Sequence, residues 1–390
     1  MPGLRDFALI FGVAAVVTLV ATPIVRWLAL RTGAVVVPDE RRVHLRPTPT
    51  IGGAAMLAGF LAGMAAAWRL DAFASVFSDS TEPLGLVIAA VLIFVVGAVD
   101  DLKEVSAPAK MAGIVLSASV LVLSGISILV FRVPFGGLLI LAPDLSYLIS
   151  VIWVIGMANA VNLIDGLDGL AAGIVAIASG TFFVYAVVLG REGLLLDGNP
   201  GALIAVIVLG MCIGFLPWNV HPARIFMGDA GALMLGLLMA ASTMVVGGRT
   251  EQEFSGQTFF FFAPLIIPLV ILGVPILDTA FAIVRRAKKG SNPATADKDH
   301  LHHRLMRIGH GHRRTVVILW AWTAVLSGFV LYPTLTGEGD AVVPVGVVAL
   351  ALLLFTVMHP EVRRARRDSA RREEASPTAT RNLPDREPLA

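Results

Sequence analysis

Apolar runs recur along almost the whole chain, and no other feature constrains its fold as strongly. A helix of roughly 20 apolar residues crosses the hydrocarbon core of a bilayer, which is about 30 Å thick. With 56% hydrophobic and only 15% charged residues, the composition is far from that of an ordinary soluble domain. We therefore predict an all-α polytopic membrane protein with about eleven transmembrane helices, over residues 6–28, 51–68, 84–99, 111–130, 145–161, 171–189, 202–218, 230–247, 259–284, 315–333 and 342–358.

Lysine and arginine residues are distributed unevenly between the loops that join these segments. The loops after odd-numbered segments, with the C-terminal tail, hold 24 of the 30, whereas the opposite side holds five. Cytoplasmic loops carry an excess of Lys and Arg, so we predict that the N-terminus lies outside and the C-terminus inside. Residues 1–358 are predicted to form the transmembrane domain, and residues 359–390 a basic, disordered cytoplasmic tail.

Two regions interrupt the regular pattern of spans. Pro and Gly residues between positions 131 and 145 predict a short irregular or hairpin element outside the membrane. Pro264, Pro268 and Pro275 predict a kink or a break in the ninth segment. The single cysteine, Cys212, excludes an internal disulfide framework.

Polar residues cluster in the loops that are predicted to face the cytoplasm. The first loop, PDERRVHLRPTPTIGG at 38–53, is basic like an ordinary cytoplasmic loop, but its glycine pair indicates backbone packed closely against another element. The second loop begins with Asp100 and Asp101 and continues to Lys103 and Lys110. Adjacent residues on a helix point about 100° apart. One acid is therefore predicted to serve chemistry and the other a structural role, unless both only cap the helix end.

The sequence NLIDGLDGL, at 162–170, places polar residues at the end of the fifth segment. If the helix continues, Asn162, Asp165 and Asp168 lie on one of its faces, because they are spaced three residues apart. The intervening glycines would leave room for a ligand or another backbone. A turn or a calcium loop is the alternative, although the sequence lacks the further oxygen ligands and the closing glutamate of an EF-hand.

The fourth loop, WNVHPARIFMGDAG at 218–231, ends with Asp229 at the start of the eighth segment. An acid near a helix N-terminus is commonly only a cap. Here other polar and aromatic residues stand within ten positions and favour a site, namely Asn219, His221, Arg224 and Phe226. Phe226 could stack on a base or anchor the chain at the membrane interface.

Histidines and arginines gather in the fifth loop, in the sequence KDHLHHRLMRIGHGHRR. We single out His300, His302, His303 and Arg304. This group lacks the cysteine or carboxylate neighbours of a structural zinc site. It suits phosphate oxygens better, because it donates hydrogen bonds and supplies positive charge. The later histidines are predicted to be surface residues, namely His310 and His312.

Together these groups are the equipment of a phosphoryl-transfer site in a membrane. Carboxylates and substrate phosphates bind Mg²⁺, basic groups bind phosphates, and the catalytic task is mostly to position and neutralise charge. The spans would bring one substrate from the lipid phase. Two other classes stay open: a secondary transporter, whose acids would lie near mid-span within related halves, and a non-catalytic lipid-binding scaffold.

Five motifs stand in order along the chain: PTPTIGG, GAVDDL, NAVNLIDGLDGL, NVHPARIFMGDAG and HLHHR. On these motifs the chain, over roughly residues 1–330, resembles the polyprenyl-phosphate N-acetylhexosamine-1-phosphate transferases, a family with MraY-like and WecA/TagO-like branches. The resemblance implies transfer of a sugar 1-phosphate from a UDP-sugar to a polyprenyl phosphate, with release of UMP at the cytoplasmic face of a bacterial cell membrane. It also implies dependence on Mg²⁺ or Mn²⁺, no nucleic-acid partner, and the homodimer that is common in the family.

The resemblance implies roles for individual residues as well. Asp229 resembles the main metal ligand, and Asp100, with Asp101 beside it, resembles the acid that deprotonates or positions the lipid phosphate. Direct attack of the lipid phosphate on the UDP-sugar is the expected route, and a covalent aspartyl-phosphate is the competing one. The remaining candidates are assigned to substrate binding, namely Asn162, Asp165, Asp168, Asn219, Phe226, Lys110, His300, His302, His303 and Arg304.

Two departures from the family pattern point to a subgroup. The histidine motif is HLHHR and not the three consecutive histidines of the pentapeptide enzymes, and an eleventh span returns the tail to the cytoplasm. Both favour the WecA-like branch, with UDP-GlcNAc as donor and an undecaprenyl or decaprenyl phosphate as acceptor. This would be the first membrane step of cell-envelope glycan synthesis, with a phospho-MurNAc-pentapeptide transferase as the alternative.

Overall fold

The computed structural model is mostly helical and describes residues 2–33, 35–36, 48–78, 80–103, 105–133, 137–247, 311–336 and 346–352. The helices are α1 (Leu4–Thr32), α2 (Gly53–Trp68), the 3-10 helix η1 (Asp71–Phe73), α3 (Ala74–Phe77), α4 (Glu82–Lys103), α5 (Ala107–Leu123), α6 (Pro143–Ile164), α7 (Leu170–Arg191), α8 (Gly201–Asn219), α9 (Gly228–Gly247) and α13 (His312–Thr336). Two antiparallel hairpins accompany them, β1 (Val35–Val36) with β2 (Thr48–Pro49), and β3 (Val130–Val133) with β4 (Gly137–Ile140).

Helices occupy the predicted segments from 6–28 to 230–247, and also 315–333. Six helices of the described chain are long and apolar enough to cross a membrane, namely α1, α4, α6, α7, α8 and α9. The pair formed by α2 and η1–α3, bent by 93°, would make a seventh. These helices are those of a multi-pass membrane protein. Predicted segment 259–284 and the tail lie outside the described residues, and 342–358 is described only at 346–352.

The fourth predicted segment, 111–130, is wrong at its C-terminal end, since α5 stops at Leu123. Gly125 has a φ of +107°, and the N–H of Ile126 donates to the carbonyl oxygen of Leu121 at 3.0 Å, which closes the helix. The β3–β4 hairpin follows, so the hairpin element predicted after this segment is confirmed.

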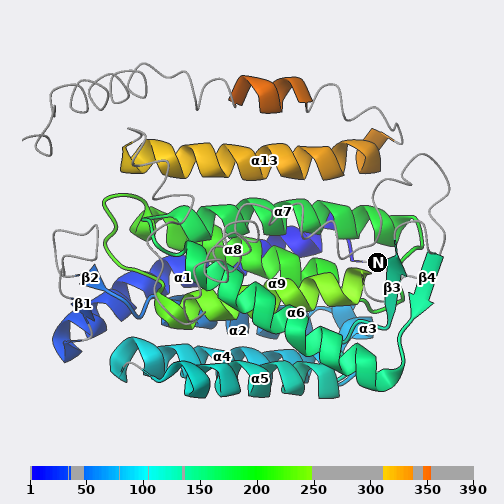
Figure 1. Cartoon of the computed structure of the whole chain (residues 1–390), viewed down its shortest axis with the longest axis horizontal. Coiled ribbons are helices and arrows are strands. Elements are labelled where there is room, and N and C mark those ends of the chain that lie inside the picture. The colour runs from blue at the N-terminus through cyan, green and yellow to red at the C-terminus, as the bar shows by residue number, and fades with distance from the viewer. Residues whose placement is uncertain are drawn as a thin grey trace, which may run out of the picture.

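Helix α9 forms the centre of the bundle. Every residue from Ala230 to Gly247 is buried, and α4, α6 and α8 pack around it. Small residues allow this packing: a Cβ on Gly236 would lie 2.6 Å from the carbonyl oxygen of Met157 in α6. Figure 1 shows α8 and α9 in the middle of the bundle, with α7 and α13 on one side and α4 and α5 on the other.

Outer helices expose apolar side chains. On α1, Val16, Val20 and Ile24 are 56–61% exposed. Their spacing of four residues places them on one helix face. Such a face would be costly in water and is suited to contact with lipid acyl chains.

The loops on one side of the bundle meet at a single polar end. The ends of α4, α6 and α8 lie there with the starts of α5, α7, α9 and α13, beside the β1–β2 hairpin, at the left of Figure 1. The N-terminus and the β3–β4 hairpin lie at the opposite end. Because consecutive helices alternate in direction, the motifs from distant parts of the sequence come together.

Candidate active site

Two carboxylates and a lysine from three helices meet at the polar end. Asp100 lies near the end of α4, Asp229 in the first turn of α9, and Lys110 in the first turn of α5. Nζ of Lys110 lies 2.8 Å from Oδ2 of Asp100 and also forms an ion pair with Asp229. The structure thus brings together three residues that the sequence predicted for one site.

The neighbouring acid, Asp101, contacts the backbone of α9. Its Oδ1 accepts the N–H of Asp229 at 2.9 Å, and its Oδ2 accepts the N–H of Ala230 at 3.1 Å. These N–H groups have no partner within their own helix, and a carboxylate is favoured at the positive end of the helix dipole. These contacts give Asp101 the structural role that was predicted for one of the two adjacent acids. Its predicted catalytic role stays a prediction.

The close approach of backbone to backbone at the start of α9 depends on two glycines. A Cβ on Gly97 of α4 would lie 2.6 Å from the carbonyl carbon of Asp229. A Cβ on Gly228 would lie 2.8 Å from Cγ of Asp101, and Gly228 also has a φ of +68°, which few other residues adopt. Main-chain contacts therefore fix the position of Asp229.

The glycine pair of the first loop packs against the residues that precede α9. The N–H of Gly52 donates to the carbonyl oxygen of Phe226 at 2.9 Å, and that of Gly53 donates to Met227 at 2.9 Å. The N–H of Phe226 donates in turn to the carbonyl oxygen of Pro49 at 2.8 Å. A Cβ on Gly52 would lie 2.5 Å from the same Phe226 oxygen. The predicted close packing of this pair is confirmed, and we call these contacts the backbone clamp.

The helix does not continue through the sequence NLIDGLDGL. Helix α6 ends one residue before Asp165, residues 165–169 form turns, and Gly169, with a φ of +76°, precedes α7. The prediction that Asn162, Asp165 and Asp168 share one helix face depended on a continuous helix and is therefore wrong, and the alternative of a turn is confirmed. Asp and Gly both favour turns over helix interiors, and each aspartate here is followed by a glycine.

Asp165 lies within electrostatic reach of three other acids. Removal from water raises the pKa of its carboxyl, and the negative charges of Asp229, Asp101 and Asp168 raise that pKa further. A carboxyl in such surroundings takes up a proton more readily than a free aspartate, and a bound cation would relieve the same repulsion.

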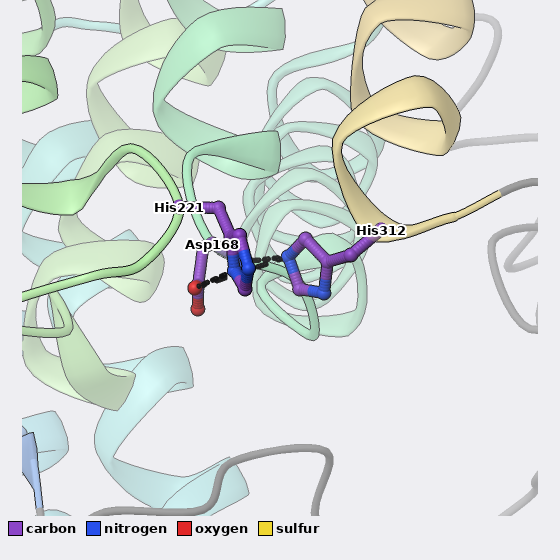
Figure 2. Close-up of side chains that lie close together, drawn as sticks. All are labelled: Asp168, His221 and His312. Atoms are coloured by element: carbon purple, nitrogen blue, oxygen red, sulfur yellow. Dashed lines mark hydrogen bonds and ion pairs between the residues drawn. The ribbon is translucent and has the colours of Figure 1, made fainter.

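Asp168 pairs with two histidines from distant parts of the chain, as Figure 2 shows. Its Oδ2 lies 2.7 Å from Nδ1 of His221, in the α8–α9 loop, and 3.9 Å from Nε2 of His312, the first residue of α13. The backbone N–H of Asp168 donates to the same Nε2 at 3.1 Å. The two imidazole rings are stacked, with centroids 4.3 Å apart and planes inclined by 27°.

Sequence reasoning missed both histidines as partners of Asp168. The prediction that His312 is a surface residue is wrong, since its side chain is only 10% exposed. The signal for its burial was its place just before the apolar run 315–333, because the first residue of that helix lies at the polar end of the bundle. His221 was noted only as a neighbour of Asp229 in sequence.

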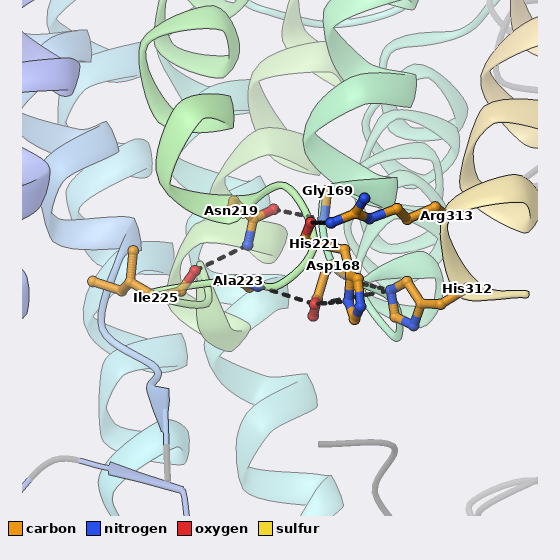
Figure 3. A network of polar contacts seen from close by, with 8 residues as sticks. All are labelled: Asp168, Gly169, Asn219, His221, Ala223, Ile225, His312 and Arg313. Atoms are coloured by element: carbon orange, nitrogen blue, oxygen red, sulfur yellow. Dashed lines mark hydrogen bonds and ion pairs between the residues drawn. The ribbon is translucent and has the colours of Figure 1, made fainter. Parts of the chain in front are cut away.

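Asn219 joins the α6–α7 turn to the α8–α9 loop, as Figure 3 shows. Its Oδ1 accepts the N–H of Gly169 at 3.1 Å, and its Nδ2 donates to the carbonyl oxygen of Ile225 at 3.0 Å. The side chain is buried. Arg313 adds a bond from α13 to the carbonyl oxygen of His221 at 3.2 Å. The contact of Asn219 with substrate stays a prediction.

The other predicted substrate-binding residues are placed less closely. The side chains of Asn162 and Phe226 are half-buried, the first in the last turn of α6 and the second in the α8–α9 loop. Four further residues lie outside the described parts of the chain, namely His300, His302, His303 and Arg304. The roles of all six stay predictions.

The carboxylates at the start of α9 are suited to a hard cation. Mg²⁺ prefers oxygen ligands and is usually held by one or two carboxylates together with substrate phosphates. Asp229 and Asp100 already share the ammonium group of Lys110, so this group of acids accommodates positive charge. Asp165 adds a third carboxyl, close enough for the charge of Asp229 to raise its pKa, and carboxylate oxygens are the donors that a magnesium ion prefers.

Known proteins resemble this chain over the region that contains the candidate site. The sequence profile described as Glycosyl transferase family 4 matches residues 83–247. This stretch runs from α4 to α9 and contains both the lysine–carboxylate contact and the α6–α7 turn.

Three curated relatives cover most of the chain. It is 38% identical to the decaprenyl-phosphate N-acetylglucosaminephosphotransferase of Mycolicibacterium smegmatis, over 93% of this chain and 90% of the relative. It is 36% identical to the probable undecaprenyl-phosphate N-acetylglucosaminyl 1-phosphate transferase of Bacillus subtilis, over 82% and 81%. It is 35% identical to the phospho-N-acetylmuramoyl-pentapeptide-transferase of Desulforudis audaxviator, over 81% and 94%.

Proposed function

Because this chain belongs to glycosyl transferase family 4, we propose that it transfers N-acetylglucosamine 1-phosphate from UDP-N-acetylglucosamine to a polyprenyl phosphate. Relatives named as decaprenyl- and undecaprenyl-phosphate transferases of this sugar phosphate align over most of both chains, which supports this pair of substrates. The products are UMP and a polyprenyl-diphosphate N-acetylglucosamine, the starting lipid of a cell-envelope glycan.

In the proposed reaction an oxygen of the polyprenyl phosphate attacks the β-phosphorus of the UDP-sugar. A P–O bond forms between the lipid phosphate and the sugar phosphate. The bond from the β-phosphorus to the bridging oxygen breaks, and UMP leaves with the electron pair. Both substrates are anions, so the protein must mainly position them and neutralise their charge.

The observation that carries the proposal is the contact of Lys110 with Asp100 and Asp229 at the polar end of the bundle. Asp100 is held in place because its Oδ1 accepts the N–H of Val105 at 2.7 Å. In the proposed roles, Lys110 attracts the phosphate oxygens and Asp100 orients the lipid phosphate. The lysine lies where it can exchange a carboxylate partner for a phosphate without leaving the site.

Mg²⁺, or alternatively Mn²⁺, is the proposed cofactor, with Asp229 as its protein ligand. When bound with the diphosphate, the ion would neutralise charge and polarise the phosphorus that is attacked. Asp101 and the backbone clamp keep Asp229 in position, so little rearrangement of the chain is needed when the substrates arrive.

The proposed site faces the cytoplasm of a bacterial cell, in a chain of eleven spans with its N-terminus outside. The uneven distribution of Lys and Arg supports this orientation, and the loops that carry the motifs lie together at one end of the bundle (Figure 1). Cys212 is buried, so new surface cysteines can be labelled selectively. An impermeant maleimide on intact spheroplasts should label Leu139→Cys in the β3–β4 hairpin, and Lys103→Cys only after permeabilisation. The reverse pattern would invert the topology.

The decisive assay is UMP release by the purified protein. UDP-GlcNAc, UDP-GalNAc and UDP-MurNAc-pentapeptide are each combined with decaprenyl and undecaprenyl phosphate, with and without Mg²⁺. We expect release with UDP-GlcNAc, and only with the ion present. Release with the pentapeptide donor instead would assign the chain to the activity of its more distant relatives, and no release from any pair would favour a transporter.

Direct attack and a covalent aspartyl-phosphate intermediate can be separated by leaving out the lipid. The protein is incubated with UDP-GlcNAc that carries a label in the sugar. Direct attack predicts no UMP and no label on the protein. UMP release with label retained on the protein would establish the covalent route.

A further inference from the structure

A second polar cluster, formed by Asp168, His221 and His312, lies outside the contact of Lys110 with Asp100 and Asp229 that carries the proposed function. Its members come from the α6–α7 turn, the α8–α9 loop and the first residue of α13 (Figure 2). His221 and His312 stand 53 and 144 residues from Asp168 in sequence, so the cluster joins three elements that are distant along the chain.

Asp168 is the centre of this cluster. Its Oδ2 lies 2.7 Å from Nδ1 of His221 and accepts the backbone N–H of Ala223 at 3.0 Å. Its own N–H donates to Nε2 of His312 at 3.1 Å, and the two imidazole rings are stacked. Arg313 donates to the carbonyl oxygen of His221 at 3.2 Å, which adds a second tie from α13 to the loop (Figure 3).

The cluster could be a metal site, because its three ligand atoms lie within 4.8 Å of one another. The hydrogen bonds argue against that use. Nε2 of His312 accepts the N–H of Asp168, so its lone pair is engaged, and the same Asp168 oxygen accepts two bonds from the α8–α9 loop. A metal ion would have to replace these bonds, whereas the bonds alone account for the arrangement.

We propose that Asp168, His221 and His312 form a latch that holds the α8–α9 loop and the start of α13 against the α6–α7 turn, with His221 and His312 as positioning residues for the transfer reaction. The latch fixes the loop at His221 and Ala223, and the backbone clamp fixes it at Phe226 and Met227.

Asp229 follows the clamped residues directly, in the first turn of α9. A loop held at both ends can shift little, so the latch limits movement of the chain that leads into Asp229. This inference rests on the proposed function, because it assigns the latch a purpose in placing the ligand of the cofactor.

The test compares variants that keep ring volume with variants that keep the hydrogen bond. His221→Phe retains a planar ring but loses the Nδ1 donor, whereas the amide nitrogen of His221→Asn can replace Nδ1. The corresponding pair at α13 is His312→Phe and His312→Gln. Ser119→Ala, on the exposed face of α5, is the control, because its hydroxyl bonds only to its own helix.

The first readout is the Mg²⁺ concentration that gives half-maximal UMP release. We expect His221→Phe and His312→Phe to raise it by about 10-fold, as loss of a supporting contact near a metal ligand commonly does. His221→Asn and His312→Gln should restore most of the wild-type value. An unchanged Mg²⁺ requirement in the Phe variants, or Asn and Gln variants as impaired as Phe, would overturn the positioning role.

The second readout does not need activity. In thermal unfolding without substrate, His221→Phe and Asp168→Ala should each lower the melting temperature by about 2–4 °C, and the double variant by less than the sum, because both remove the bond between these two side chains. His221→Phe with Ser119→Ala should be additive. Additive losses for the Asp168 pair would disprove the latch. A coupled pair in a protein that releases no UMP would retain the latch and reject the proposed function.

Discussion

The carboxylate of Asp101 accepts the backbone N–H of Asp229 at 2.9 Å, so Asp101 holds Asp229 in position. Asp100, one position earlier, contacts the lysine that also pairs with Asp229. The two neighbouring carboxylates on α4 therefore have different contacts in the same site: Asp101 binds the backbone of α9, and Asp100 binds the side chain of Lys110.

Replacing Asp101 by asparagine tests this arrangement. Asparagine offers one acceptor oxygen for two N–H groups and lacks the charge that the helix start favours. We expect a loss of about 1–2 kcal/mol in stability, measured by thermal unfolding in detergent. Asp144→Asn, at an exposed position in the first turn of α6, is the matched control and should lose far less. Equal losses would mean that the Asp101 contacts contribute nothing specific.

Gly97→Ala should separate α4 from α9. Its Cβ would lie 2.6 Å from the carbonyl carbon of Asp229, and overpacking of this kind costs about 1–3 kcal/mol. We expect a lower melting temperature and a marked loss of UMP release. Gly156→Ala on α6 is the control, since its Cβ would have no neighbour within 4 Å. Alanine is the better helix former, so that variant should be neutral or slightly more stable.

Lys110→Met removes the cation between Asp100 and Asp229 and leaves two carboxylates without it. We expect a stability loss of about 1–3 kcal/mol without divalent ions. Added Mg²⁺ should restore more of the melting temperature in this variant than in the wild type, because the ion can replace the lost charge. Lys103→Met, at an exposed position at the end of α4, should show no such difference. A response to Mg²⁺ equal to that of the wild type would argue against a cation site here.

Asp165→Asn should stabilise the protein without Mg²⁺, and more so as the pH rises. The folded-state pKa of Asp165 lies above that of an unfolded aspartate, so the folded state holds the proton more tightly. Below the unfolded pKa, about 3.9, the group has no effect. Above it, ionisation destabilises the fold increasingly until the folded pKa is passed. Melting temperatures of both proteins from pH 5 to pH 9 should therefore diverge. A gap that stays constant with pH would contradict the assignment.

Much of the fold could be predicted because hydropathy depends on local sequence. The apolar runs located α1, α2, the helices from α4 to α9, and α13, whereas the short η1 and α3 were not predicted. Pro and Gly residues located the β3–β4 hairpin. The end of α5 was misplaced because the apolar composition continues past the helix. There Gly125, which has a positive φ, ends the helix, and no change in polarity marks the place.

The candidate site could be predicted only where residue type itself indicates chemistry. Asp100, Lys110 and Asp229 were expected together and are in contact. The pairing of Asp168 with His312 could not be read from the chain, because it joins residues 144 positions apart. The task of Asp101 was equally hidden, since two adjacent acids of identical type differ only in which way the helix turns them.

The start of α9 is held by main-chain atoms and by glycines that tolerate no Cβ. An inhibitor that bound the main chain of this turn would meet a surface that substitution at Gly97 or Gly228 cannot change without displacing Asp229 as well. Resistance would then have to arise by raising enzyme levels or by excluding the compound from the cell.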